Sequence, residues 1–323
     1  MRRQFLKQAA ALSASLAVSP FAFGQAEWPT RPIKLIVPYP PGGALDPIAR
    51  ALGQRLTVSL GQPVIVENKP GGGTSIAATA VTKGEPDGYS LLFTSPITHV
   101  VHTLQAPRGY DSVKDFAAIS AVSRGDFSLV VHPSVPATTL TEFIAWGKAN
   151  PDKISASLSG IGGADHLATE LFKYQTGIKL TGVTYKGSGP ALVDLLAGRT
   201  QMFIIAHSLA QQHVEAGKLR VLAYTAQPVG KPPVPTFAQA GLKDFEQFVT
   251  MNIILAAAAT PQPVVAKLTA AIKEALENTE TRTAIMAANQ APFYMTPAAL
   301  NAKLAGDSAK FADIIQKTGI KFE

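Results

Sequence analysis

The sequence predicts an α/β protein of two domains, and three observations support that prediction. Short β-branched apolar runs alternate with helical patterns, as in βα units around a largely parallel sheet. The chain has 323 residues, 46% of them hydrophobic, which is more than one core usually takes up. The alternation occurs in two series, and the closing helices have no strands of their own to cover. We therefore expect the end of the chain to pack back onto the first series.

This reading gives the second domain residues 126–245 and the first domain residues 27–125 and 246–323. The chain would cross between the domains twice, near Arg124–Phe127 and Gly230–Phe245, with Pro228–Pro235 as a proline-rich crossing segment. Two crossings beside each other are typical of a hinge between domains.

The first series contains three expected strands, at Ile33–Val37, Pro63–Glu67 and Tyr89–Thr94. The helix expected at Ile48–Leu60 has Asp46 as its N-cap, Pro47 at its first position and Gly61 as its stop signal. A second helix, Thr74–Val81, follows a turn of three glycines.

The second series and the C-terminal part continue the pattern. We expect strands at Ser128–Val131, Ile154–Ser157, Leu180–Tyr185, Gln201–Ile205, Leu219–Tyr224 and Val249–Ala257. We expect helices at Leu140–Lys148, His166–Tyr174, Pro190–Ala197, Pro263–Asn278 and Thr279–Ala288. Gly177 closes the helix His166–Tyr174, and Gly198 closes the helix Pro190–Ala197. A last helix runs from Thr296-Pro297 to about Lys317.

Residues 1–26 have the three-part layout of a cleaved signal peptide: basic residues, an apolar run from Ala9 to Val18, then small residues. The apolar run is too short to span a membrane, which takes roughly 20 residues. Arg2-Arg3 also fits the twin-arginine export motif, and the export route stays open. We expect a mature protein that is free in the periplasm, without stable membrane insertion.

Composition narrows the classes of partner. Once the three basic residues Arg2, Arg3 and Lys7 are removed with the signal, 26 of 29 Lys and Arg remain against 22 Asp and Glu. They are scattered singly, whereas nucleic-acid binding needs a concentrated basic surface. The chain has no cysteine, which suits an oxidising compartment and excludes thiolate chemistry.

Three glycine-rich junctions between a strand and a helix are the main functional signal. They are Pro40–Asp46, Ser159–Asp165 and Tyr185–Pro190, divided between the two expected domains. In open α/β sheets, ligands bind beyond the carboxyl ends of strands, where helix N-termini present free N–H groups that suit an anion. Ordinary βα turns also use glycine, so each junction alone says little. Their recurrence favours loops that face each other across one cleft.

Other chemistries find little support. Gly160-Ile161-Gly162 lacks the third glycine of a dinucleotide-binding loop, and the chain contains no Gly-x-Ser-x-Gly elbow. His99 and His102 have no carboxylate at metal-ligand spacing, so we interpret them as polar loop residues. We predict no cofactor, no metal and no catalytic residue.

Longer motifs carry a family resemblance across essentially the whole mature chain. The sequence resembles the Bug (Bordetella uptake gene) or TctC-like family, the solute-binding receptors of tripartite tricarboxylate transporters. The matching segments are Trp28–Ile33, Ile36–Gly43, Leu60–Val64, Val66–Gly71, Pro86–Tyr89, Val130–Pro133, His166–Ala168, Glu170–Phe172, Tyr185–Gly187, Asp194–Gly198, Ala216–Arg220 and Thr260–Pro261.

The resemblance implies a type II periplasmic-binding-protein fold with a Venus-flytrap cleft that captures a small organic acid, often through waters. Carried over by position, it places Tyr39, Gly42, Gly43, Asp46, Ser95 and Thr98 on one side of the ligand. Opposite them it places Ser157, Gly160, Gly163, His166, Tyr185 and Lys186. It further implies that the partners are the membrane permease subunits of the transporter. We also expect the protein to be a monomer.

The chain departs from the family pattern at two places, around Met251 and Ile253 and at Ile204–His207. Both could line the cleft, so the ligand is expected to be bulkier or more apolar than citrate. Two other functions stay open at this point: a sensory receptor that presents its closed form to a signalling kinase, and an enzyme that uses the same cleft.

Overall fold

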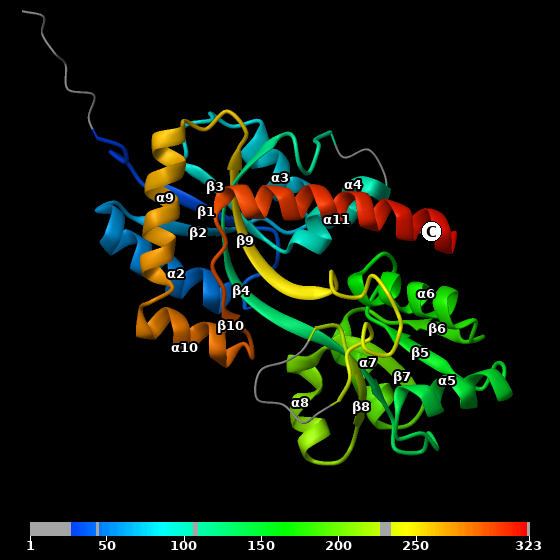
Figure 1. Ribbon diagram of the computed structural model, residues 1–323. Coiled ribbons are helices and arrows are strands. Elements are labelled where there is room, and N and C mark those ends of the chain that lie inside the picture. The colour runs from blue at the N-terminus through cyan, green and yellow to red at the C-terminus, as the bar shows by residue number, and fades with distance from the viewer. Residues whose placement is uncertain (1–26, 43–44, 106–108, 227–233, 322–323) are drawn as a thin grey trace, which may run out of the picture.

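The computed structural model describes residues 27–42, 45–105, 109–226 and 234–321. The expected signal peptide, Gly43 and most of the Pro228–Pro235 segment lie outside these ranges. Two α/β lobes lie beside each other and are connected by the long strands β4 and β9 (Figure 1). Among the described helices, none is long and apolar enough to cross a membrane.

The first lobe is built on a parallel core of three strands, in which β1 lies between β2 and β3. These strands are β1 (Ile33–Val37), β2 (Val64–Asn68) and β3 (Ser90–Thr94). The strand β9 (Val249–Ala257) pairs antiparallel with β3 and also with β4 (Phe116–Val131). The two-residue strand β10 (Ala291–Pro292) adds to β4.

The second lobe continues from β4. Strand β4 pairs antiparallel with β7 (Met202–Ala206) and with β8 (Arg220–Tyr224). Beyond β7 follow β5 (Ser155–Leu158) and β6 (Thr181–Thr184), which run parallel to each other. The main strand order is β2-β1-β3-β9-β4-β7-β5-β6.

Strand β4 belongs to both lobes and begins earlier than expected. Its residues Phe116–Asp126 pair with β9, and Phe127–Val131 pair with β7. The segment expected as a crossing, Arg124–Phe127, therefore lies inside a continuous strand that begins well before Ser128. The first part of this strand was not expected because its serines interrupt the apolar pattern. Ser120 is fully buried, and its Oγ lies within hydrogen-bond distance of the carbonyls of Ala121 (2.8 Å) and Met295 (3.0 Å), which offsets the cost of burying the hydroxyl.

The helices flank the sheet, and most of them fall where the sequence places them. In the first lobe these are α2 (Asp46–Leu60), the short 3₁₀ turn η1 (Gly72–Thr74), α3 (Ser75–Thr82) and α4 (Pro96–Gln105). The second lobe contains α5 (Leu140–Ala149), α6 (Ala164–Thr176), α7 (Ser188–Leu196) and α8 (His207–Glu215). The C-terminal part contains α9 (Gln262–Ala275), α10 (Thr279–Ala287) and α11 (Pro297–Thr318).

Two of these helices, α4 and α8, were not expected. His99 and His102 consequently lie on a helix and not in a loop. His99 is fully buried, stacks at 5.9 Å on Tyr110 and meets the Phe116 ring edge-on at 4.7 Å. Its Nε2 lies 2.9 Å from the Ser112 carbonyl, and burial lowers its pKa to about 4. His99 is therefore a neutral core residue at physiological pH.

The predicted helix boundaries hold with small shifts. Gly61 adopts the left-handed conformation (φ 69°) that ends α2, and the Thr296 side chain caps α11. Leu45, not Asp46, is the N-cap of α2, whereas Gly198 (φ 71°) follows the C-cap Ala197 and closes α7 as expected. Asp46 is instead the first helical residue, where its side chain is free to bind the preceding loop.

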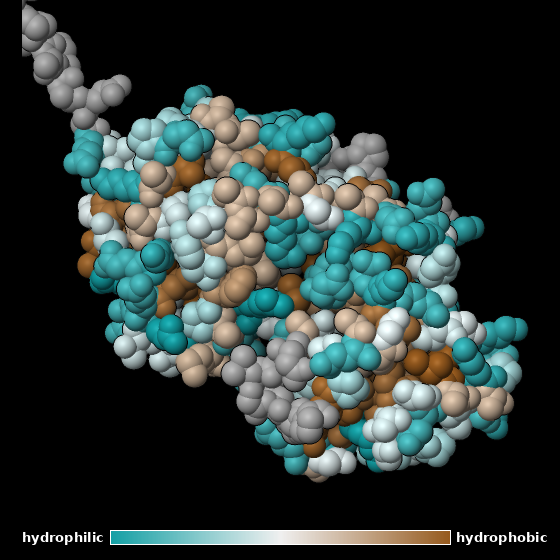
Figure 2. All heavy atoms as spheres, viewed as in Figure 1, coloured by the Kyte–Doolittle hydropathy of each residue, from teal (hydrophilic) through white to brown (hydrophobic). Residues whose placement is uncertain are grey.

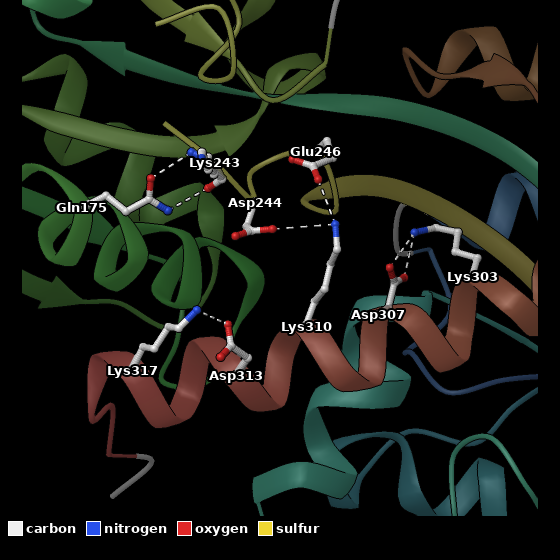
Figure 3. Close-up of polar contacts among 9 residues, drawn as sticks. All are labelled: Gln175, Lys243, Asp244, Glu246, Lys303, Asp307, Lys310, Asp313 and Lys317. Carbon is white, nitrogen blue, oxygen red and sulfur yellow. Dashed lines mark hydrogen bonds and ion pairs between the residues drawn. The ribbon is translucent and has the colours of Figure 1, made fainter. Parts of the chain in front are cut away.

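Helices α9 and α10 pack on α2 of the first lobe, as expected, but α11 also contacts α6 of the second lobe. Figure 3 shows Lys310 of α11 between two carboxylates of the segment that precedes β9, Asp244 (3.7 Å) and Glu246 (2.8 Å). A run of aromatic contacts at 4.0–6.3 Å leads from α5 to α11. Its rings are Phe143, Phe172, Phe237, Phe245, Phe248 and Phe311. The core thus continues from one lobe to the other on this side.

The outer surface gives no single large apolar face in the view of Figure 2. Hydrophilic residues are interspersed with small apolar groups there, over both lobes. Scattered apolar residues are normal on a soluble surface.

Candidate functional site

A cavity of about 550 Å³ lies between the two lobes. Its walls come from six segments of the chain: the starts of α2, α4, α6 and α8, the first residues of β9, and the end of α10. Phe127 of β4 also lines it, at the point where that strand passes from one lobe to the other. The cavity is large enough for a small organic molecule.

Four helices begin at this cavity, two from each lobe. Leu45, the N-cap of α2, lines it, as does Ser95, which immediately precedes α4. From the second lobe come Ala164, the first residue of α6, and Ala206, the N-cap of α8. Helix N-termini carry unpaired N–H groups and the positive end of the helix dipole. Because all four helices begin at its wall, they favour a negatively charged group in the cavity.

The loop before α2 is held in place by Asp46. This carboxylate accepts hydrogen bonds from the Gly42 amide (3.2 Å), Asn68 Nδ2 (3.1 Å) and Arg50 Nε (2.8 Å). The bond to Arg50 is the largest influence on Asp46 and lowers its pKa below the usual value. Gly42 has φ 78°, a conformation that favours glycine, and it lines the cavity. Asp46 therefore holds the loop in place without itself lining the cavity.

The Tyr39 hydroxyl is hydrogen-bonded to Thr98, which lines the cavity, whereas Tyr39 itself does not belong to the lining. Burial raises the pKa of the Tyr39 hydroxyl, and hydrogen bonding to Thr98 offsets part of that increase. Thr98 and Ser95 both line the cavity. The Tyr39 carbonyl accepts from Asn68 Nδ2 (3.0 Å), so the amide that supports Asp46 also fixes this residue.

In the second lobe, the loop before α6 is likewise held by an aspartate of the helix that follows it. Asp165 accepts hydrogen bonds from the backbone N–H of Ser159 and from its hydroxyl. Gly160 and Gly163 are bonded to each other through the backbone (3.4 Å), and Gly163 is the N-cap of α6. His166 Nδ1 accepts from the Gly162 amide (3.0 Å), and burial lowers the His166 pKa. His166 thus supports the loop as a neutral acceptor.

Of the predicted residues that the structure describes, only Gly42, Ser95 and Thr98 line this cavity. Ser157 is fully buried, and its Oγ bonds Thr200 Oγ1 (2.7 Å) and the Ala191 carbonyl (3.1 Å). The Tyr185 hydroxyl donates to Asp194 (2.8 Å) on α7, and the Lys186 side chain is exposed. Gly43 lies outside the described residues. A direct role in binding stays a prediction for every predicted residue outside the lining, which are Tyr39, Gly43, Asp46, Ser157, Gly160, Gly163, His166, Tyr185 and Lys186.

Sequence analysis missed much of the wall. Of the two departures from the family pattern, Met251 and Ala206 do line the cavity, whereas Ile253 and Ile204 are buried in the core. The start of α8 was missed because that helix was not expected. The end of α10 was missed because no local signal links it to a cleft far away along the chain.

Two hydrogen bonds join the lobes at opposite ends of the cavity. Gln105 Nε2, at the end of α4, donates to the Gly162 carbonyl (3.2 Å) of the second lobe. Asn289 Nδ2, after α10, donates to the Ser208 carbonyl (3.3 Å) at the start of α8. The lobes are therefore in contact on both sides of the cavity.

The cavity wall is neutral. No Lys, Arg, Asp, Glu or His side chain belongs to the lining in the part of the chain that the structure describes. Nor do those residues contain a group of three or more His, Asp or Glu side chains that could hold a metal ion. Recognition here rests on backbone N–H groups, hydroxyls, amides and apolar contacts.

The two lobes, the strands that cross between them and the cavity at the crossing define a periplasmic-binding-protein fold. Solved structures agree. A TctC solute-binding protein from Polaromonas superposes with a TM-score of 0.80 at 27% identity, covering 90% of this chain and 99% of that one. An R. palustris protein solved with adipate gives 0.75 at 30% identity (91% and 99%). MatC from Rhodopseudomonas palustris, with bound malate, gives 0.71 at 27% identity (89% and 100%).

The family follows from the sequence comparisons. The model of the tripartite tricarboxylate transporter family receptor, TctC, matches residues 48–320. Protein BugT of Bordetella pertussis is 35% identical over 301 residues, which cover 92% of each chain. The chain belongs to this family of solute-binding receptors. The resemblance in its motifs and the expected fold are both confirmed.

Proposed function

We propose that this protein captures a small carboxylate in the cavity between its lobes and delivers it to the permease subunits of a tripartite transporter. The observation that carries the proposal is the convergence of four helix N-termini, two from each lobe, on one cavity without a charged side chain in its described lining. An anion there would gain N–H donors from both lobes at once. The similar proteins solved with adipate and malate support the same ligand class.

The capture mechanism is closure of the lobes onto the ligand. A ligand that contacts both lobes stabilises the closed form because those contacts exist only there. We place the domain boundaries at residues 125/126 and 245/246, so that β4 bends near Gly125. A Cβ at Gly125 would lie 2.5 Å from Thr250 Oγ1, so glycine lets β4 and β9 approach closely at this point.

The contact residues that we propose are the predicted ones, in two groups. Tyr39, Gly42, Gly43, Ser95 and Thr98 would face the ligand or hold the first loop, with Asp46 behind them. Gly160, Gly163 and His166 would do the same in the second lobe, next to Ala164. Ser157 of β5, with Tyr185 and Lys186 of the third junction, completes the predicted set.

The cellular setting is part of the proposal. Residues 1–26 would be removed as a signal peptide, by either the general or the twin-arginine route, and the mature chain would act in the periplasm as a monomer. It would use no cofactor and carry out no reaction. Delivery would need only that the permease subunits recognise the closed form.

Isothermal titration of the mature protein with small carboxylates tests the capture. A ligand at about 100 times its Kd should also raise the stability by about 2.7 kcal/mol, which is readily seen as an increase in Tm. Ala164→Trp should abolish binding because the indole would fill the space at the start of α6. The matched control is Ala149→Trp at the exposed end of α5, which should bind as the unchanged protein does.

The proposal fails if no carboxylate binds a folded protein, or if Ala164→Trp binds as well as Ala149→Trp. Circular dichroism and the Tm of both variants establish that each is folded.

A further inference from the structure

We propose that two amide side chains in the cavity wall, Asn252 and Gln290, recognise a hydroxyl group on the ligand. The inference rests on the proposed capture function and narrows its ligand to a hydroxy acid, a carboxylate whose carbon chain also carries a hydroxyl. It depends on hydrogen-bonding groups of these two amides that the protein itself does not use.

Three neighbouring strands bring the two amides together. Asn252 of β9 lies opposite Ser123 of β4, and Ser123 lies opposite Pro292 of β10. Gln290 comes two residues before Pro292, between α10 and β10. Asn252 and Gln290 both line the cavity, Asn252 is 2% exposed and Ser123 is fully buried. Asn252 is therefore a polar group at the cavity that bulk water hardly reaches.

Three hydrogen bonds hold the amides in a fixed orientation. Asn252 Nδ2 donates to Ser123 Oγ (2.8 Å) and to Gln290 Oε1 (3.1 Å), and Ser123 Oγ donates to the same Gln290 oxygen (2.7 Å). These bonds use the amide N–H groups of Asn252, the hydroxyl hydrogen of Ser123 and the side-chain oxygen of Gln290. Within the described residues, neither Asn252 Oδ1 nor Gln290 Nε2 has a hydrogen-bond partner.

The pair therefore offers one acceptor and one donor at the cavity wall. Turning both amides by 180° reverses the three bonds and again leaves one acceptor and one donor, so this result does not depend on how the amides are turned. A ligand that displaces water from the wall without pairing these two atoms leaves polar groups unsatisfied, which weakens its binding.

A hydroxyl group matches the pair because it can donate and accept at the same time. An ionised carboxylate can only accept and an ammonium group can only donate, so each of them would leave one member of the pair unsatisfied. Sites that hydrogen-bond a ligand hydroxyl discriminate strongly against analogues that lack it. We therefore expect the hydroxyl to set the specificity, while the helix starts hold the carboxylate.

A purely structural role is the alternative, because the same bonds join β9, β4 and the segment before β10. Asn252 is the only polar residue between Met251 and Ala257 of β9, so either role could account for it. A structural role predicts that replacing Asn252 changes the stability and leaves the preference among ligands unchanged. Recognition of a hydroxyl predicts that the preference itself is lost.

Titration calorimetry with six acids of the same chain length tests the inference: hexanoate and the five hydroxyhexanoates with the hydroxyl at carbons 2 to 6. We expect at least one isomer to bind about tenfold more tightly than hexanoate, as two hydrogen bonds in a shielded site should provide. The amino acid with an ammonium group at the same carbon as the preferred hydroxyl should lose this gain, because it cannot accept from the free N–H.

Two variants locate the recognition. Asn252→Leu and Gln290→Met keep the approximate shape of each side chain and remove its hydrogen-bonding groups. Each should bring the affinity of the preferred hydroxy acid to within about twofold of that of hexanoate. Gln211→Met is the matched control and should keep the preference, because Gln211 of α8 bonds Glu215 (2.8 Å) and does not line the cavity. Circular dichroism and the Tm establish that each variant is folded.

The outcomes separate this inference from the function on which it rests. If hexanoate binds and no hydroxy isomer binds more tightly, the inference is wrong while carboxylate capture stands. The same holds if the amino acid binds as tightly as the hydroxy acid, or if either folded variant keeps the preference. If no acid binds the folded protein, the capture function itself fails.

Discussion

The two lobes build their ligand-facing loops in the same way but with opposite electrostatics. In each lobe a glycine-rich loop enters a helix, and an aspartate in the first turn of that helix binds the loop: Asp46 holds Gly42, and Asp165 holds Ser159. Asp46 has Arg50 beside it, which lowers the Asp46 pKa. Asp165 is 5% exposed and has no ion pair among the described residues, and burial raises its pKa.

The difference shows that the loop geometry does not depend on the charge state of its aspartate. A carboxylate that accepts several N–H bonds can shape a loop whether a cation stabilises it or burial destabilises it. The contribution to stability differs, however. Ionised Asp46 stabilises the fold, whereas ionisation of Asp165 works against the fold.

The largest expected effect in this comparison comes from Asp46→Asn. The variant loses the charge-assisted bonds to Arg50 and leaves the Arg50 guanidinium without its partner, so unfolding by urea should show a loss of about 2 kcal/mol. The sign with pH follows from the lowered pKa of Asp46. Its stabilisation is present above the pKa of the unfolded chain and disappears as the pH falls through the native value.

Asp87→Asn is the control for this variant, because the pair of Asp87 with Arg31 lies on the surface. A surface pair of this kind contributes no more than about 1 kcal/mol. Equal losses in the two variants would show that Asp46 is an ordinary surface residue and not the anchor of the first loop.

A smaller effect is expected in the second lobe from Ser157→Ala. The Ser157 hydroxyl of β5 is bonded to the Ala191 carbonyl of α7 and to the hydroxyl of Thr200, which follows that helix. Its removal leaves these buried partners unsatisfied. The free energy of unfolding should decrease by about 1 kcal/mol. Thr200→Val removes the other partner and is the matched variant. If the double variant loses no less than the sum of the two single losses, the two hydroxyls do not act together.

The smallest effect at neutral pH is expected from Asp165→Asn. Asparagine keeps an acceptor for Ser159 and removes a charge that burial disfavours, so the change should stay within about 1 kcal/mol. The raised pKa means that native Asp165 binds its proton more tightly than the unfolded chain does. The wild-type protein therefore loses stability as the pH rises from the unfolded to the native pKa.

Urea unfolding as a function of pH measures how each aspartate contributes to the free energy of unfolding. Relative to the wild-type protein, Asp165→Asn should become more stable as the pH rises, whereas Asp46→Asn should become less stable. The same pH trend in both variants would contradict the difference between the lobes.

Local signals in the sequence were enough for most of the fold. Gly61, Gly177 and Gly319 end helices in the left-handed conformation, and Thr296 caps α11, as their residue types predict. The first half of β4 was missed because Ser120, Ser123 and Asp126 interrupt its apolar pattern. Their environment is set by tertiary contacts, such as the bond from Ser120 to the Met295 carbonyl.

The candidate site likewise has one part that the sequence predicts and one part that it does not. The glycine loops could be found because the conformations they need leave a mark in the sequence, as Gly42 with φ 78° shows. The wall formed by α10 could not, because Ala284 and Ala287 are ordinary alanines of an amphipathic helix. Only the packing of α10 against α2 brings them to the cavity.

A crystal structure of the mature protein with a small carboxylate that binds it in titration tests the central claim most directly. We predict the carboxylate group within hydrogen-bond distance of backbone N–H groups from both lobes, at the starts of α2 or α4 and of α6 or α8. A ligand bound outside the cavity, or in contact with one lobe only, would contradict capture between the lobes.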